Sequence, residues 1–337
     1  MSDGHFPTSV AFALLLVFLA GTTATANDSA AELSVGGLVF TRTADVSLES
    51  EELTISPDLV VVRYEFLNTT TRPVTLTVGF PLPAIDLSEG DNYAIPVNDA
   101  SNFLGFETKV DGKPIKLAIQ QTAHLGDKDI SAALKKAGVP LLPIGPQQAR
   151  LTELPQPIRD DLIDKGLLLK NGTNDRGEQL YVGGWTVKTA AVRQQTFAPQ
   201  AKVAVEHRYR TSLGVSFDTV LRKGLRQSSG LAAEIQRYRN DYCITDAFLA
   251  SLDKLSGSRE ANTAKVQERR ISYVLKTGAN WAGPIKDFRM VVDKQKPDRL
   301  VSFCAENIKP ISSTSVEVRA KDFVPNKDLK ILIVGRF

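Results

Sequence analysis

The sequence predicts a mainly β protein built from two β-sandwich-like domains with short helical insertions. Apolar and polar residues alternate over residues 59–67 and 74–80, and this period of two places one face of a strand in a core. A second series of short apolar runs, separated by turn residues, extends over residues 181–337. Helical spacing of apolar residues is confined to short stretches, so we expect helices as insertions between strands.

The first expected domain covers residues 27–123. Within it, Val60, Val62, Tyr64 and Phe66 share one face of a strand, and residues 68–73 supply turn chemistry before the next strand. Further on, Asp111-Gly112 lies between two strand-like runs and suits the positive φ angles of a tight hairpin turn. About six short strands with regular turns are typical of a sandwich.

A Pro-rich helical insert is expected over residues 124–180. Short helical patterns occupy residues 131–137 and 157–165, and each is followed by a glycine that can end a helix. The proline density is also compatible with a partly extended linker, which is the alternative for this segment.

The second expected domain covers residues 181–337 and carries an inserted helical hairpin at about residues 228–256. Apolar residues recur there at spacings of three, four and seven, which indicates a helix with one buried face. These residues are Ile235, Tyr238, Tyr242, Leu249 and Leu252.

The N-terminus predicts export. Residues 10–20 are an uncharged apolar run that is too short to cross a membrane, and Ala24-Thr25-Ala26 follows as a cleavage site. We therefore expect residues 1–26 to be a signal peptide and the mature protein to be periplasmic or secreted, with no transmembrane segment after cleavage.

Overall charge argues against nucleic acid as a partner. The 337 residues contain 41 Lys and Arg against 38 Asp and Glu, a formal net charge of +3. Binding to a phosphate backbone needs a concentrated basic surface, which this balance does not supply.

The two cysteines, Cys243 and Cys304, both lie in the part expected to be exported. In an oxidising compartment the expected state of such a pair is one disulfide bond. Two alternatives are a buried pair of free thiols and a cysteine nucleophile activated by His207.

His207 and Tyr209 are expected to be polar residues of the core. Both occupy the face of an alternating strand that also carries Val205, whereas Glu206 and Arg208 point to the opposite face. A hydrogen-bonded interior histidine fits this placement better than a catalytic or pH-sensing one.

Four residues are candidates for ligand binding: Asn280, Trp281, Trp185 and Tyr181. A tryptophan on a loop offers a flat ring and one N–H donor to a sugar face or a peptide. The alternative is that Trp281 and Trp185 are core residues that close the ends of the sandwiches.

The sequence contains none of the common catalytic motifs. It lacks G-x-S-x-G, H-E-x-x-H, a P-loop and G-x-G-x-x-G, and its histidines and cysteines form no local cluster suited to zinc. No metal site and no cofactor are therefore predicted, and whether the chain is an enzyme stays open, with binding favoured.

Several segments together resemble the DUF4424 family of exported bacterial proteins. They are Asn27-Asp28-Ser29-Ala30, residues 36–40, Phe80-Pro81-Leu82-Pro83, residues 205–209 and residues 277–285. The resemblance covers nearly the whole mature chain and implies an exported protein of two sandwiches without an assigned activity. Within the first domain, residues 66–68, 80–83 and 106–115 are also similar to a VIT domain, which implies a fold and no site.

Two functions follow from these observations. The first is a non-catalytic binding or structural module of the cell envelope that presents loops to a protein or glycan partner. The second is a periplasmic hydrolase acting on an envelope polymer, with its site at the junction of the domains. An enzyme should gather an acid or base with an oxyanion donor in that cleft, whereas a binding module should expose an apolar patch.

Overall fold

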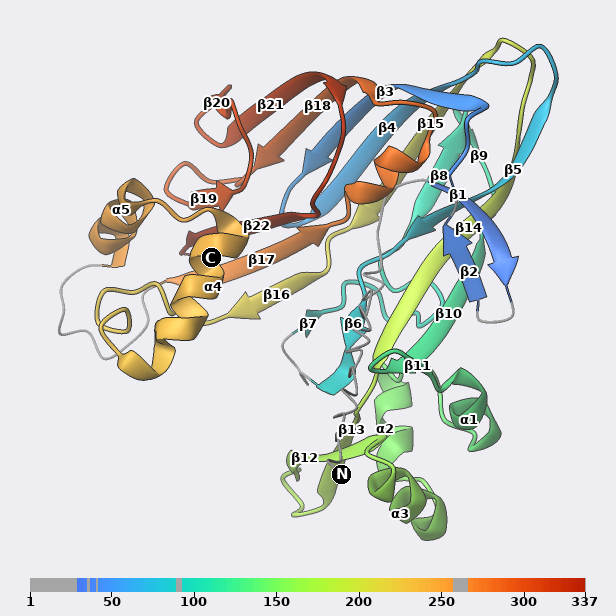
Figure 1. The fold of residues 1–337 in the computed structure, drawn as a ribbon. Helices are drawn as coiled ribbons and strands as arrows, with labels where there is room; N and C mark the ends of the chain where they lie inside the picture. The colour runs from blue at the N-terminus through green and yellow to red at the C-terminus, as the bar shows by residue number, and fades with distance from the viewer. Residues whose placement is uncertain (1–28, 35–36, 41, 89–92, 257–265, 337) are drawn as a thin grey trace, which may run out of the picture.

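The computed structural model describes residues 29–34, 37–40, 42–88, 93–256 and 266–336. It is mainly β, with large sheets packed in layers and a few short helices at the periphery, which confirms the predicted fold class (Figure 1). The expected signal peptide, residues 1–26, lies outside the described residues. None of the helices in the described part of the chain has the length and apolar character needed to cross a membrane.

The largest sheet has eight strands and combines segments from both ends of the chain. It includes one parallel pair among its interior strands, β18 with β3, in which Met290 lies opposite Leu53. The turn at Asp111 and Gly112, with φ angles of 47° and 75°, joins β8 to β9 as the hairpin signal predicts. In order across the sheet the strands are β20 (Lys309–Pro310), β21 (Ser315–Phe323), β18 (Ile285–Asp293), β3 (Val46–Ile55), β4 (Leu59–Asn68), β15 (Lys202–Arg210), β8 (Glu107–Val110) and β9 (Lys113–Pro114).

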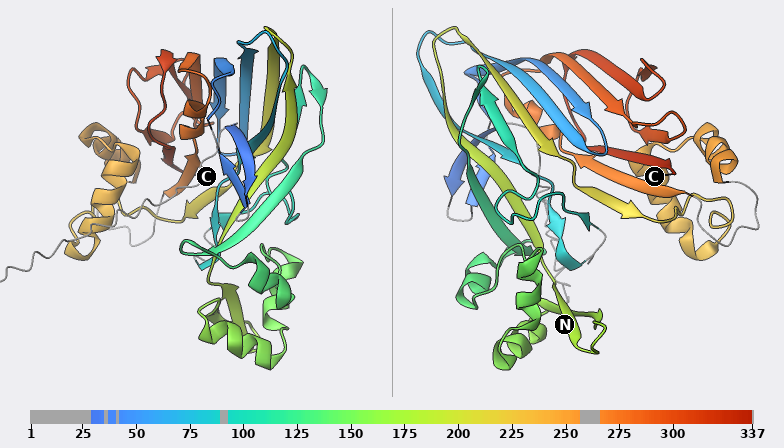
Figure 2. Two further views of the ribbon diagram at one scale, coloured as in Figure 1. Left: turned by 45° about the vertical axis from the view of Figure 1, so that its right-hand side comes forward. Right: turned by 180° about the vertical axis from the view of Figure 1, so that it is seen from behind.

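A seven-stranded sheet packs against the part of this sheet formed by β4, β15 and β8 (Figure 2). The layer between them is aromatic: the Phe80 and Phe106 ring centroids lie 4.9 Å apart, and those of Phe66 and Trp281 lie 4.5 Å apart. The strands of this sheet are β11 (Lys128–Asp129), β10 (Ala118–Leu125), β14 (Thr186–Phe197), β5 (Val74–Pro81), β1 (Ser29–Ser34) and β2 (Gly37–Phe40), with β6 (Ile85–Asp86) beside β14.

A five-stranded sheet covers the part of the eight-stranded sheet that contains β18 and β21. Its strand β22 is buried on both faces. Ile331 and Ile333 belong to the main core, whereas Leu332 and Val334 pack against helices on the far side, so this strand reads as a continuous apolar run. The strands are β19 (Leu300–Phe303), β22 (Leu329–Gly335), β17 (Gln267–Tyr273), β16 (Leu213–Ser216) and β7 (Tyr93–Ala94). The helices are α4 (Ala232–Tyr242) and α5 (Asp246–Ser256), within the stretch predicted to hold a helical hairpin.

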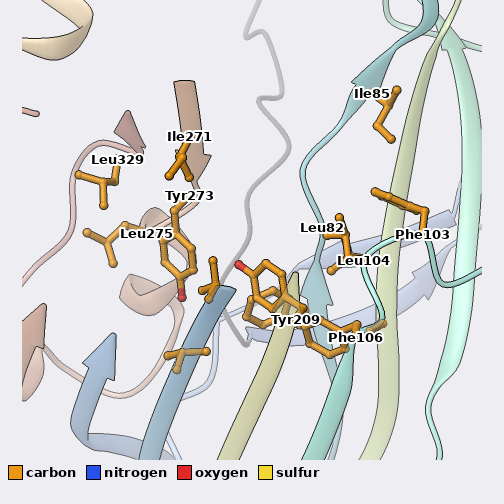
Figure 3. Packing of buried hydrophobic residues seen from close by; sticks show 14 of the residues in the cluster. Leu82, Ile85, Phe103, Leu104, Phe106, Tyr209, Ile271, Tyr273, Leu275 and Leu329 are labelled. Carbon is orange, nitrogen blue, oxygen red and sulfur yellow. The ribbon is translucent and has the colours of Figure 1, made fainter. Parts of the chain in front are cut away.

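One continuous core joins these sheets. In Figure 3, Tyr273, Leu275 and Leu329 form one group of side chains, and Leu82, Leu104 and other residues form a second group beyond the central strands. The expected division of the chain near residues 123 and 180 stays a prediction. Strands of the two expected domains share sheets: β14 and β15, from the second domain, pair with β5 and β4, from the first.

The expected helical insert holds three short helices and a small hairpin, which lie together at one end of the molecule (Figure 2). They are α1 (Ser131–Lys136), α2 (Pro146–Thr152), α3 (Gln156–Asp164), β12 (Leu168–Thr173) and β13 (Gln179–Gly183). Short 3-10 turns at Ser229–Leu231 and Lys276–Asn280 complete the regular structure.

Candidate functional site

A groove of about 760 Å³ opens where the eight-stranded and five-stranded sheets diverge. One wall belongs to β18 and β21. The opposite wall belongs to the start of β22 and to Leu275 and Lys276, where the second 3-10 turn begins. In Figure 1 this is the side where the layer formed by β18, β20 and β21 lies over β19 and β22. The volume is within the range of sites that hold small ligands or anchoring side chains.

The floor of the groove is apolar. Phe288 and Met290 of β18 lie opposite Ala320 and Val318 of β21, so these four side chains share one face of the sheet. The Phe288 and Met290 side chains are only 1% and 2% exposed. Because strand side chains alternate between faces, this row is fixed by the register of the two strands.

The rim of the groove is charged, with both signs present. Its charged residues are Asp241, Lys276, Glu306, Lys327, Asp328 and Lys330. Lys330 Nζ lies 2.8 Å from a carboxylate oxygen of Asp241, and this ion pair joins the sheet to the end of α4. An apolar floor inside a polar rim is the usual anatomy of a protein interface.

One border of the groove is tied by a disulfide bond. Cys243 ends α4 with a φ of 51° and is bonded to Cys304, with 5.0 Å between their Cα atoms. The predicted pairing is confirmed, and the two alternatives, free thiols and a cysteine nucleophile, are wrong for this structure. Cys304 and the residues after it line the groove, so the bond fixes the position of this border.

The two tryptophans predicted as binding candidates are core residues instead. Trp281 is 3% exposed and packs on Phe66, while Trp185 is 1% exposed and donates its indole N–H to the Leu141 carbonyl oxygen at 2.8 Å. A loop position in the sequence does not show whether the loop folds over the core, and here both loops do. Neither ring is available to a ligand.

The other two candidates do not line the groove either. The Asn280 carbonyl oxygen accepts a hydrogen bond from the Thr43 N–H at 2.9 Å, so its backbone has a structural partner. Tyr181 is half-buried on β13, with the Arg159 guanidinium 5.6 Å from its ring centroid. A binding role for Tyr181 stays a prediction, separate from the groove.

His207 and Tyr209 are both buried in the aromatic layer, where the sequence places them. The His207 side chain is fully buried, and its Nδ1 lies 2.7 Å from the Thr108 hydroxyl oxygen. The rings of Phe80 and Phe106 surround it, with centroids 4.9 and 5.0 Å away. Burial raises the pKa of Tyr209 far above its ordinary value, so its hydroxyl stays protonated.

Comparison with known families agrees with the resemblance found in the sequence. Residues 26–332 match the family described as a domain of unknown function, DUF4424. The chain belongs to the DUF4424 family. None of the curated proteins matches the sequence.

Solved structures provide distant similarities to this DUF4424 protein. A candidate nutrient binding protein from Legionella pneumophila has a TM-score of 0.41 and 15% identity, with 93% of this chain and 73% of that chain covered. An M1 zinc metallopeptidase from Deinococcus radiodurans has a TM-score of 0.23 and 10% identity, with 88% of this chain and 44% of that chain covered. The DUF4424 chain therefore spans less than half of the metallopeptidase.

A buried polar cluster beneath α4 was not predicted from the sequence. The Tyr238 hydroxyl donates a hydrogen bond to a Glu268 carboxylate oxygen at 2.6 Å. Arg270 forms an ion pair with the same carboxylate and donates a hydrogen bond to the Ser216 hydroxyl oxygen at 2.8 Å. Burial, and then the charge of Glu268, raise the pKa of Tyr238. Burial also raises the pKa of Tyr242 to about 12. These groups hold α4 on the sheet of the DUF4424 fold.

The groove itself was also missed, because its residues carry no local signal. The floor residues were predicted only as parts of strands, and the rim residues are ordinary charged side chains in loops. They become neighbours through the pairing of β18 with β21 and through the disulfide bond. Only the cysteine pair gave an indication that distant segments meet here.

Proposed function

We propose that this protein is a non-catalytic binding module of the cell envelope and that its groove receives a segment of a partner protein. The observation that carries the proposal is the groove between the two sheets, with its apolar floor and its charged rim. An apolar site ringed by polar groups is typical of a place where another molecule docks.

The chemistry of the lining supports binding over hydrolysis. Among the described residues that line the groove there is no serine, threonine or histidine, and the one cysteine is in the disulfide bond. Acyl transfer through a hydroxyl or thiol nucleophile needs such a residue together with a base and an oxyanion donor. Carboxylates are present at the rim, but Asp241 is already engaged by Lys330.

A protein segment fits the groove better than a glycan does. Sugars are commonly held on exposed aromatic faces, and the two tryptophans that could have offered such faces are buried. The apolar groups that the groove offers to an apolar side chain are instead those of the partly exposed Ala320 and Phe323 and the exposed Val324.

Filling the groove should weaken binding of an apolar probe. We expect the native protein to bind the dye 8-anilinonaphthalene-1-sulfonate at one saturable site, measured by fluorescence titration. The variant Ala320→Trp, which places a large ring over the floor, should weaken this binding by at least about tenfold, the effect of losing roughly 1.4 kcal/mol of binding free energy.

The matched control is Ala204→Trp, which adds the same ring at an exposed position of β15 in the same sheet. It should bind the dye as the native protein does, and both variants should keep their melting temperatures. Equal dye affinity in Ala320→Trp and in the native protein would contradict the proposal.

Export is the second part of the proposal, and it rests on the apolar run and the Ala24-Thr25-Ala26 site. We expect protein recovered from the periplasm or the medium to begin at Asn27. Intact-mass measurement decides this, because removal of residues 1–26 changes the mass by a known amount. A recovered species that retains Met1 would show that the segment is not cleaved.

A further inference from the structure

The strand that forms one wall of the groove has an open edge. β21 pairs with β18 along its length, but on its other side the short strand β20 pairs only with Val316 and Glu317. Among the described residues no strand pairs with that side of β21 beyond Glu317. An unpaired edge of this kind offers backbone donors and acceptors to another chain.

The backbone groups that face the open edge can be identified from their neighbours. The Ser315 carbonyl oxygen accepts from the Ile311 N–H at 3.0 Å, on the β20 side, whereas the Thr314 carbonyl oxygen accepts from the Lys294 N–H at 2.9 Å, on the β18 side. Because these directions alternate along a strand, the N–H and C=O groups of Arg319 and Lys321 point to the open edge.

The side chains along this edge are apolar on one face of the strand and basic on the other. Val318 and Ala320 belong to the groove floor, whereas Arg319 and Lys321 project on the opposite face with 61% and 76% of their side chains exposed. Each forms an exposed ion pair within the sheet, Arg319 with Glu317 at 3.0 Å and Lys321 with Asp287 at 2.9 Å. Such exposed pairs are weak, so an acidic side chain of an added strand can compete for either cation. The exposed Lys309 lies on β20 next to them. A strand added here would therefore meet apolar groups on one face and basic groups on the other.

We propose that the edge of β21 from Val318 to Lys321 accepts an extended segment of a partner protein as an additional strand, with apolar side chains directed into the groove and acidic side chains beside Arg319 and Lys321. This rests on the proposed function and gives its mode of recognition: backbone hydrogen bonds supply affinity and alternate side chains supply specificity. Opposite charges in neighbouring strands stabilise such pairing.

The edge also has a defined end. The register with β18 passes from Lys321 opposite Asp287 to Phe323 opposite Ile285, and Asp322 has a φ of 48°. This positive φ takes the backbone at Asp322 out of the extended conformation, although pairing with β18 resumes at Phe323 in the same register. The extended part of the open edge therefore runs from Val318 to Lys321.

Two N-methylated peptides test strand addition directly. The parent probe is an octapeptide of alternating valine and glutamate with blocked ends, and its binding to the mature chain is measured by fluorescence anisotropy. One derivative is methylated at the amides of the valines and the other at the amides of the glutamates. Only the residues of one set direct their N–H groups to β21, so one derivative should lose more than about tenfold in affinity and the other should bind like the parent.

A charge exchange tests the predicted neighbours of the acidic residues. The variant Lys321→Glu should bind the valine–glutamate peptide about tenfold more weakly and should prefer an octapeptide of alternating valine and lysine. The control Lys223→Glu changes an exposed lysine outside the groove and should alter neither affinity.

The outcomes separate this inference from the proposed function. If both methylated peptides bind like the parent, the groove holds side chains without strand addition and the inference is wrong while the proposed function stands. If the parent does not bind although the dye does, strand addition at this edge is also refuted. If the dye does not bind, the proposed function fails on its own test.

Discussion

Replacing Cys243 and Cys304 together by serine is expected to lower the free energy of unfolding by about 4 kcal/mol. The bond closes a loop with a sequence separation of 61 residues and thereby reduces the freedom of the unfolded chain. The loss should appear in urea unfolding as a lower midpoint for the variant than for the oxidised native protein.

Reduction of the native protein is the control. Adding a reductant should lower the stability of the native protein to that of the double variant, and it should leave the double variant unchanged. Titration of the denatured, unreduced native protein should detect no thiol. Two reactive thiols, or a double variant as stable as the native protein, would contradict the role given to this bond.

Replacing His207 by Gln is expected to cost roughly 1–3 kcal/mol of stability, because the change disturbs a hydrogen bond to Thr108 in a fully buried aromatic layer. Dye binding in the groove should be unaffected. Chemical unfolding and dye titration on the same sample measure both quantities. The control is His124→Gln, at a partly buried histidine on β10, which should cost less.

A double-mutant cycle tests the contact itself. Thr108→Val should also be destabilising, and the double variant should cost less than the sum of the single variants, because the second change removes a group that the first has left without its partner. Strict additivity would mean that His207 and Thr108 are not coupled. An unchanged melting temperature with loss of cellular function would instead assign His207 a direct functional role.

The sequence predicts those parts of the fold that depend on local periodicity. The alternation over residues 59–67 gives β4, and the apolar spacing near Tyr238 and Leu249 gives α4 and α5, because each pattern is set by the geometry of its own element. The disulfide bond could be predicted because only two cysteines are present.

The pairing of distant strands could not be predicted in the same way. β3 lies parallel to β18, and no local pattern records which strand a neighbour will be. The same limit explains why Trp281 was interpreted as a binding residue: its burial depends on Phe66, which belongs to a strand far away in the sequence. The groove follows from these long-range pairings and was missed for that reason.

Photocrosslinking in cells tests the groove as a binding site most directly. Val324 lines the groove and is 60% exposed, so a photoreactive phenylalanine derivative at this position lies beside any bound segment. The same derivative at Phe217, which is 76% exposed and outside the groove, is the reference. We expect a discrete protein adduct from position 324 that is absent from position 217 and is lost when Ala320→Trp is added. No adduct at position 324, or one that Ala320→Trp leaves unchanged, would contradict the assignment of the groove as the binding site.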